Sequence, residues 1–383
     1  MQQNNLKQQF LLHQDITYLN FGAFGACAKP VFEKYQAFQL ELEQEPVNFL
    51  RVKGPQYLSA ARVALAEYLH CNADDIVYVP NPTFAVNIIA KSFNLQPGDE
   101  VLATDLEYGA CDKTWKYYCE KKGATYIQQK TRFPIQSKED FVEQFTNGIT
   151  AKTKLIFISH ITSSTGLRLP VAEICAIAKA KGIICFVDGA HAPGQLSVNL
   201  SVLGADIYTG ACHKWMMTPK GSSFFYVEKS LQHLFDPLSI SWGYASDHPS
   251  HSQFLDYHQF QGTRDYSAFL TIPAALQFMK ENNWETVSNN CKAITQNNAA
   301  RFCELLKAEP LCPVNDDFIG QLYCTTIKTD NPVKLHALLY EKYKIQVAVM
   351  PHEDKVFLRY SIQAFNSNED LDKLYDALKK IGV

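Results

Sequence analysis

Short apolar runs alternate with segments of helical periodicity over the first two thirds of the chain. The runs predict strands at 76–79, 100–104, 125–129, 155–160, 183–187, 206–209 and 223–227. Apolar positions recur at helical spacing in the segments 84–92, 110–122, 138–145 and 171–181. Strands that alternate with helices in this way predict an α/β fold, with a mainly parallel seven-stranded sheet sandwiched by helices.

This alternation ends near residue 266, and the rest of the chain predicts a smaller α+β domain. Helices are expected at 267–281, 285–307, 332–343 and 368–380, and strands at 321–328, 346–349 and 356–360. We therefore divide the chain into an N-terminal segment, 1–30, a large domain, 31–281, and a small C-terminal domain, 282–383. The N-terminal segment is expected to pack near the functional site and the small domain.

Composition adds limits to this picture. The 383 residues are 46% hydrophobic and 20% charged, which is enough for two domains with a sizeable core. A net charge of −3 without a basic run gives no electrostatic case for nucleic acid. The polar N-terminus lacks the apolar core of a signal peptide, and no run approaches the roughly 18 apolar residues of a membrane span. We expect a cytoplasmic protein with no membrane or nucleic-acid partner.

Eleven cysteines are scattered along the chain without the CxxC pairs that zinc sites favour. We expect them to be reduced, with several of them filling core space, and we expect no metal site.

The strongest chemical signal is a lysine that follows an aspartate by 26 residues (214 − 188). Asp188 ends the apolar run 183–187, and open α/β sheets bind ligands at the carboxyl ends of their strands. An aldehyde cofactor needs an amine to hold it, and its ring nitrogen stays protonated beside an ionised carboxylate. Each residue alone is more typical of a surface charge or a turn. Together they predict a pyridoxal phosphate enzyme, with Lys214 as the Schiff-base lysine and Asp188 as the ring-nitrogen partner.

Other strand ends carry further candidates. Thr83 lies near the start of a helix, where free amides and a hydroxyl could face a phosphate, although Thr83 could simply cap that helix. His213 could donate to phosphate or be an ordinary satisfied polar group. Tyr108 could lie flat on the pyridine face or be an ordinary boundary tyrosine.

His191, three residues beyond Asp188, could reach the phenolic oxygen of the cofactor. Thr162 and Ser163 end another strand and could bind the same phenolic oxygen or the substrate. Arg359 interrupts an apolar strand, where an unpaired guanidinium would be costly. Its expected carboxylate partner is either a structural Asp or Glu or an amino-acid substrate.

Taken together, these segments resemble the class V aminotransferases of pyridoxal phosphate fold type I, and within them the isopenicillin-N-epimerase-like branch. The resemblance spans nearly the whole chain and rests on six strings in the expected order: YLNFGAFGAC at 18–27, PVNFLR at 46–51, DGAHAPG at 188–194, CHKW at 212–215, QGTRD at 261–265 and LRYS at 358–361.

The resemblance implies a role for each matching residue. It makes Lys214 the lysine that holds the cofactor, Asp188 the ring-nitrogen partner, His191 a ligand of the phenolic oxygen and Tyr108 the stacking ring. The phosphate is expected to be bound by Thr83, by the backbone amide of Phe84 and by His213. Gly262 and Thr263 reach the phosphate of the neighbouring subunit, which implies a homodimer. The implied substrate-binding residues are Arg359, which binds the α-carboxylate, Asn20 and Gly22. Phe21 stands where the family often has His, which suggests a more apolar substrate mouth.

The implied reaction begins at the α-carbon of an amino acid or amino-acid derivative, where the freed lysine removes a proton. Epimerisation or racemisation and C–S lysis are equally favoured outcomes, and transamination is third. A family member that binds a ligand without turnover is the alternative from another class. Desulfuration through a persulfide is disfavoured, because the stretch 347–355, where the family's reactive cysteine is expected, contains none.

Overall fold

The central sheet of the protein has seven strands in the order β2-β8-β7-β6-β5-β3-β4. We describe a computed structural model, which covers residues 6–352 and 354–383. The strands are β2 (Ile76–Val79), β3 (Glu100–Thr104), β4 (Thr125–Gln129), β5 (Thr153–Ser159), β6 (Ile184–Asp188), β7 (Ile207–Ala211) and β8 (Ser223–Val227). Only β8 runs against its neighbours in this sheet. The predicted α/β fold class is confirmed.

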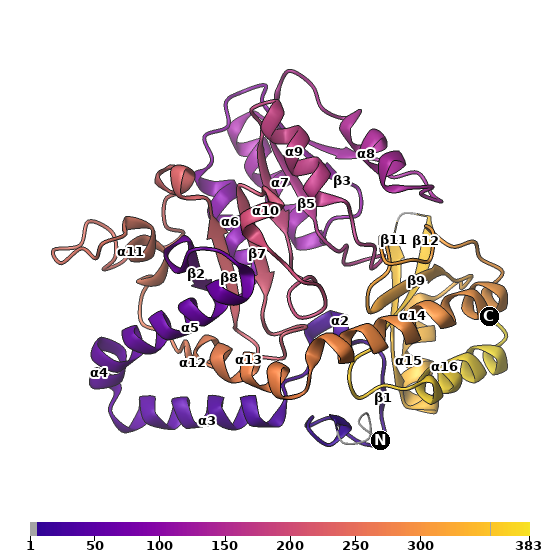
Figure 1. Cartoon of the computed structure of the whole chain (residues 1–383). Coiled ribbons are helices and arrows are strands. Elements are labelled where there is room, and N and C mark those ends of the chain that lie inside the picture. Colours follow the sequence, from indigo (N-terminus) through magenta and orange to yellow (C-terminus); the bar gives the residue numbers. More distant parts are fainter. Residues whose placement is uncertain (1–5, 353) are drawn as a thin grey trace.

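Helices cover both faces of this sheet (Figure 1). Alternate residues of β2 enter two different cores, with Ile76 and Tyr78 on one side and Val77 and Val79 on the other. The first core includes α5 (Gly54–Leu69), α8 (Lys138–Thr146) and α9 (Val171–Ala180), and the second includes α6 (Pro82–Ser92) and α7 (Gly109–Lys122). Burial on both faces explains why the strands read as continuous apolar runs.

The small domain has a three-stranded antiparallel sheet in the order β11-β12-β9. Its elements are α14 (Trp284–Leu306), β9 (Leu322–Thr326), α15 (Pro332–Tyr343), β11 (Ala348–His352), β12 (Lys355–Ser361) and α16 (Asn368–Ile381). The single strand expected at 346–349 is wrong, because buried Val347 separates two short strands with different partners. The first of them, β10 (Ile345–Gln346), pairs with β1 (Thr17–Tyr18) and ties the N-terminal segment to this domain.

The helix expected at 267–281 is two helices, α12 (Ser267–Leu270) and α13 (Ile272–Glu281), with Pro273 in the first turn of the second. Proline cannot continue the hydrogen-bond ladder of a preceding helix, so the break falls there. The remaining elements are α2 (Phe21–Phe24), α3 (Lys29–Gln44), α4 (Pro46–Asn48), the π-helical turn Phe49–Lys53, α10 (Leu200–Leu203), α11 (Gln253–Gln259) and the 3-10 turns Ala73–Asp75 and Lys229–Leu234. Within the described ranges, no helix has the length and apolar character needed to cross a membrane.

Candidate active site

The candidate residues gather where the parallel strands of the large sheet end. Strands β2, β3, β5, β6 and β7 all finish at the same edge of the sheet. Asp188 is the last residue of β6, and it pairs with Thr209 of β7, five residues before Lys214. Adjacent strand ends therefore bring Asp188 and Lys214 together, as in other open α/β sheets.

We call Asp188, His191 and Lys214 the lysine half of the site. The half-buried Lys214 places its Nζ 3.0 Å from Nε2 of His191. The pKa of Lys214 is lowered to about 8, mainly by burial; the charge of Asp188 opposes this shift, and the charge of Arg359 contributes to it. The amine is consequently neutral in an appreciable fraction of molecules near neutral pH, and a neutral amine is the form that attacks an aldehyde.

Asp188 is held by two neighbours. Its Oδ1 accepts a hydrogen bond from the Ala190 amide at 2.9 Å, and Oδ2 lies 3.8 Å from Sγ of Cys111. Burial raises the pKa of Asp188, while the Ala190 amide and the charge of Lys214 lower it. A buried carboxylate in this position gains stability from a cation, such as a protonated ring nitrogen. No sequence pattern predicts that Cys111 lies near Asp188, because this contact depends on how α7 packs.

His191 is almost fully buried and lies between two side chains that follow each other in the sequence. Its Nε2 faces Lys214, and its Nδ1 lies 3.3 Å from Nε1 of Trp215. Burial and the neighbouring charges of Lys214, Arg359 and His213 hold the pKa of His191 well below its usual value. The imidazole is therefore neutral.

We call Asn20, Gly22 and Arg359 the arginine half. The Arg359 guanidinium is buried, donates from Nη1 to the carbonyl oxygen of Ser163, and donates from Nη2 to Oδ1 of Asn20 at 3.3 Å. Its Nε has no partner, and within the described residues Arg359 enters no ion pair. Burial lowers its pKa to about 10. A structural Asp or Glu partner is thus not found here, and a ligand carboxylate would satisfy the free N–H.

Gly22 is the residue of the arginine half that comes close to the lysine half. A Cβ at this position would come within 2.7 Å of Leu322 and 3.6 Å of both Arg359 and His191. Glycine thus allows the backbone to approach both groups closely. The expectation that Phe21 lines the substrate mouth is wrong. Its ring is fully buried and packs on Trp215 at 5.1 Å, because its side chain points away from the site into the core.

The phosphate candidates are positioned in different ways. His213 places Nδ1 3.1 Å from the Ser222 carbonyl oxygen, and burial lowers its pKa to about 4. The N-cap of α6 is Asn81, so the alternative that Thr83 caps this helix is wrong. Oδ1 of Asn81 accepts from the Phe84 amide at 3.0 Å, so a phosphate would compete with Asn81 for this donor, and the predicted phosphate contact stays a prediction. Tyr108 is 49% exposed, at the start of α7.

Thr162 forms local hydrogen bonds in the turn that follows β5. Its fully buried hydroxyl lies 2.7 Å from Oγ1 of Thr165 and accepts from the Leu167 amide at 2.9 Å, so it stabilises the turn 162–167. Its expected role toward the phenolic oxygen or the substrate stays a prediction. Ser163 contributes through its carbonyl oxygen, which accepts from Arg359.

Gly262 and Thr263 lie in the exposed loop after α11, and Gly262 has φ of 99°. Few residues other than glycine adopt this left-handed conformation. Within the described part of the chain, no hydrogen bond joins either residue to Lys214 or to Asp188.

Glu107 was not predicted from the sequence. This buried carboxylate accepts from Oγ1 of Thr104 at 2.7 Å and from Oγ of Ser159 at 2.5 Å. It thereby joins the ends of β3 and β5 beneath the site. Burial raises the pKa of Glu107 to about 8, and the charge of Asp188 adds to the increase. The available signal was a glutamate just after a strand and directly before Tyr108.

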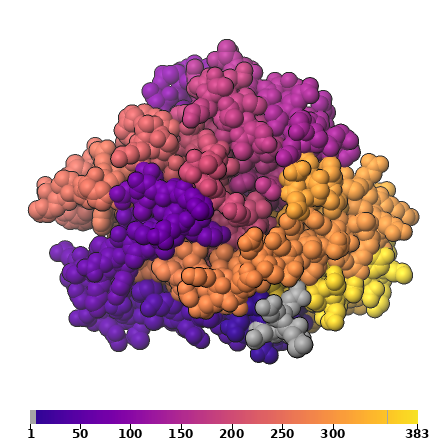
Figure 2. Space-filling view, in the orientation of Figure 1, coloured from indigo at the N-terminus to yellow at the C-terminus, as the bar shows by residue number. Residues whose placement is uncertain are grey.

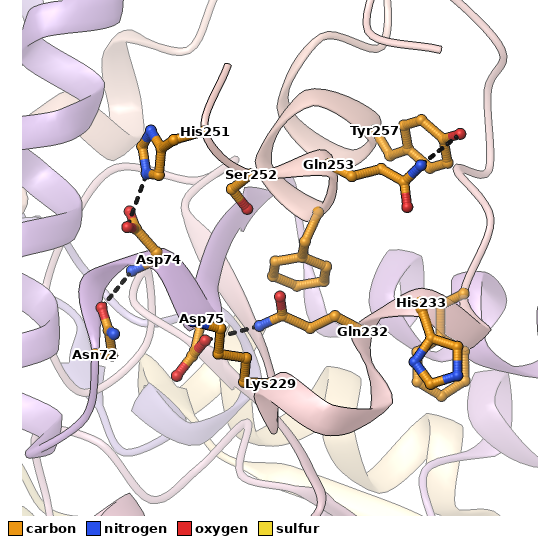
Figure 3. A pocket seen from close by; sticks show the side chains of 12 residues that line it. Asn72, Asp74, Asp75, Lys229, Gln232, His233, His251, Ser252, Gln253 and Tyr257 are labelled. Carbon is orange, nitrogen blue, oxygen red and sulfur yellow. Dashed lines mark hydrogen bonds and ion pairs between the residues drawn. The ribbon is translucent and has the colours of Figure 1, made fainter. Parts of the chain in front are cut away.

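A cavity of about 290 Å³ lies elsewhere on the large domain (Figure 3). None of the predicted site residues lines it. Several of its polar groups pair with one another, as in the His251 to Asp74 contact of 2.8 Å and the Gln232 to Asp75 contact of 2.8 Å. Because these groups are already satisfied, the cavity offers few free polar contacts to a ligand.

The chain is similar in sequence to a known protein family and to several characterised relatives. The family model for aminotransferase class-V matches residues 23–374. The isopenicillin N epimerase of Amycolatopsis lactamdurans is 30% identical over 98% of each chain. A probable chloroplastic L-cysteine desulfhydrase of Arabidopsis thaliana is 26% identical over 98% of this chain and 85% of its own length.

Solved structures share the fold. The apo cysteine desulfurase of Thermococcus onnurineus NA1 superposes with a TM-score of 0.85 at 18% identity, covering 99% of this chain and 97% of its own. The cystine C-S lyase C-DES in complex with cysteine persulfide gives 0.84 at 22% identity, covering 95% and 97%.

Proposed function

This chain belongs to the class V aminotransferase family, and we propose that it removes the α-proton of an amino acid or amino-acid derivative. The family, the pyridoxal 5'-phosphate cofactor and the enzymatic character predicted from the sequence are confirmed by the family match and the full-length relatives. The bound cofactor supplies an electron sink for the charge that develops at the α-carbon.

One observation carries the proposal. A Cβ on Gly22 would lie 3.6 Å from both the buried Arg359 guanidinium and the ring of His191, whose Nε2 lies 3.0 Å from the half-buried amine of Lys214. Arg359 holds the substrate carboxylate, and Lys214 takes the α-proton once its amine is free. Asp188 carries the negative charge that would hold a protonated ring nitrogen, while Tyr108, His213 and Thr83 are the remaining candidates for holding the cofactor.

Epimerisation or racemisation is the first candidate outcome. Its support is that two isopenicillin N epimerases align at 30% and 29% identity over nearly the whole chain. C–S lysis is the second candidate, because the cysteine desulfhydrases also align over nearly the whole chain, at 25–27% identity. Transamination ranks third.

A persulfide route is not part of the proposal. The stretch 347–355 contains no cysteine. Burial raises the pKa of cysteines near the site, including Cys111, Cys212 and Cys324. A thiol with a raised pKa is a poor nucleophile at neutral pH.

A panel of amino acids in deuterated water tests the proposal. The panel includes L-cysteine, L-cystine and isopenicillin N, and mass spectrometry follows deuterium at the α-carbon. Inverted product indicates an epimerase. Sulfide released together with ammonia and an oxo acid indicates a lyase, and an oxo acid formed without free sulfide or ammonia indicates an aminotransferase. Exchange should disappear in Lys214→Ala. No exchange with any substrate would overturn the proposal and favour a binding protein.

We also propose a homodimer in which Gly262 and Thr263 reach the phosphate of the neighbouring subunit. The segment 236–260 projects from the body of the molecule (Figures 1 and 2) and carries Trp242, which is 87% exposed. Both polar atoms of the Gln261 side chain are buried without a partner among the described residues. Exposed aromatics beside unsatisfied polar groups are typical of a surface that a second chain covers.

Mixing two inactive variants tests the shared site. Chains carrying Lys214→Ala and chains carrying Thr263→Ala should regain activity together, because each mixed dimer contains one intact site. Sedimentation should give twice the chain mass. Failure to regain activity would argue against sharing.

We propose the cytoplasm as the working compartment, since the eleven cysteines are all free, as suits a reducing environment. Cell fractionation with a tagged chain would test this.

A further inference from the structure

His191 lies between the half-buried side chain of Lys214 and the buried side chain of Trp215. Lys214 lies on the Nε2 side at 3.0 Å and Trp215 on the Nδ1 side at 3.3 Å. A third contact holds the backbone, where Nε2 of Gln195 donates to the His191 carbonyl oxygen at 2.7 Å. The ring is therefore fixed in position, and what remains open is which nitrogen carries its proton.

The indole N–H of Trp215 determines which nitrogen of His191 is protonated. An indole N–H is a donor only, so the ring nitrogen that faces it has to be an acceptor. Nδ1 of His191 is consequently unprotonated, and the neutral imidazole carries its proton on Nε2, facing Lys214. The opposite tautomer would place two N–H groups against each other inside the core, at the cost of an unsatisfied buried donor.

We propose that Trp215 is a positioning residue that locks His191 in the Nε2–H tautomer, so that the site presents a fixed hydrogen-bond donor beside Lys214. This inference rests on the proposed function. The donor favours an acceptor in front of it, which is the neutral amine of Lys214 or an anionic oxygen of a bound cofactor. An ammonium group has three donors and no acceptor, so it is disfavoured in the same place.

The surroundings of Trp215 support a positioning role. The indole is fully buried and packs on Phe21 at 5.1 Å. A Cβ on Gly194 would come within 2.3 Å of the Trp215 backbone. Gly194 also has φ of 93°, a conformation that favours glycine. Glycine at position 194 thus lets the Trp215 backbone approach closely, which holds in place the residue whose indole N–H faces His191.

Nitrogen NMR of the full-length, cofactor-free chain labelled with ¹⁵N-histidine tests the inference. The expected His191 spectrum has a protonated Nε2 and an unprotonated Nδ1. The reverse pattern, or a charged ring at pH 7, would overturn the proposal, and this measurement requires no tryptophan variant. Because it uses neither substrate nor turnover, it stands or falls separately from the amino-acid panel.

Trp215→Phe keeps the aromatic packing and removes the N–H. The matched control is Trp115→Phe, because Trp115 is equally buried and its Nε1 has no partner among the described residues. Trp215→Phe should populate the Nδ1–H tautomer of His191, whereas Trp115→Phe should leave it unchanged. An unchanged tautomer in Trp215→Phe would overturn the proposal.

The reactivity of Lys214 gives a second readout. With Nε2 free to accept, the ammonium form of Lys214 gains a partner, and its pKa should rise by about one unit, equivalent to about tenfold less neutral amine at pH 7. Pulse acetylation with mass spectrometry of the Lys214 peptide measures this loss. Equal acetylation rates in Trp215→Phe and Trp115→Phe would contradict the lock.

Discussion

The lysine half and the arginine half of the site are built in different ways. The lysine half comes from one short stretch of chain, and its members contact one another or close neighbours. The arginine half joins Asn20 to Arg359 across 339 positions of sequence and leaves Nε of Arg359 without a partner among the described residues. The lysine half would gain a cation from a bound cofactor, at Asp188, whereas the arginine half would gain a carboxylate from a substrate. We infer that the lysine half serves the permanent cofactor and the arginine half the exchanging substrate.

Removal of the lysine should produce the largest effect. In the proposed roles, Lys214 is both the amine that holds the cofactor and the base at the α-carbon, so α-deuterium exchange should fall about 10³-fold or more in Lys214→Ala. The control is Lys179→Ala, an exposed lysine on α9. Exchange that persists in Lys214→Ala at the wild-type rate would place the base elsewhere and break the distinction between the halves.

A change in the arginine half should separate binding from chemistry. Arg359→Lys loses the planar fork that suits a carboxylate, so kcat/KM should fall about 10- to 100-fold, mainly through a higher KM. Arg301→Lys is the control, because Arg301 pairs with Asp372 at the surface of the small domain. A variant whose kcat falls while its KM stays constant would show that Arg359 acts in the chemical step instead.

The two halves also differ in how far the sequence predicts them. Asp188 and Lys214 follow strands that are buried on both faces, and such strands read clearly as apolar runs. Their meeting then follows from the rule that parallel strands end at one edge. The role of Trp215 could not be read in this way, because it depends on which way an indole points within the core.

The helices of the N-terminal region could not be predicted from the spacing of apolar residues. α3 buries only Val31 and Phe38 among its sixteen residues, so it has almost no apolar stripe. Prolines at the starts of α3 and α5 were a usable signal, since proline is favoured in the first helical turn. The contact of Asn20 with Arg359 joins the two ends of the chain, and no local pattern predicts it.

The lowered pKa of Lys214 predicts how the reactivity of its amine depends on pH. Because its pKa is lowered to about 8, its neutral fraction should rise with pH and level off above pH 8. Below that value, acetylation of the cofactor-free protein should slow by about tenfold per pH unit. Surface lysines such as Lys179 provide the internal reference in the same digest. A midpoint near 10 would mean that burial does not act on this amine as described.

The smallest effect is expected beneath the lysine half, at Glu107. Its pKa is raised from 4.5 to about 8 in the folded protein, so the folded state binds the proton more tightly than the unfolded chain does. Stability should therefore fall as pH rises from about 4.5 to about 8 and then level off. Between pH 5.5 and 8.5, this group should cost on the order of 1–3 kcal/mol in the free energy of unfolding, measured with urea.

Glu107→Gln should remove this part of the pH dependence, because an amide does not titrate and can still accept from Thr104. Glu304→Gln, at an exposed position of α14, should keep the wild-type slope. Equal slopes in the two variants would mean that Glu107 is ionised throughout. Asp188 would then share the site with a second negative charge, which would oppose its own ionisation, and the lysine half would no longer hold a single anion for the cofactor ring.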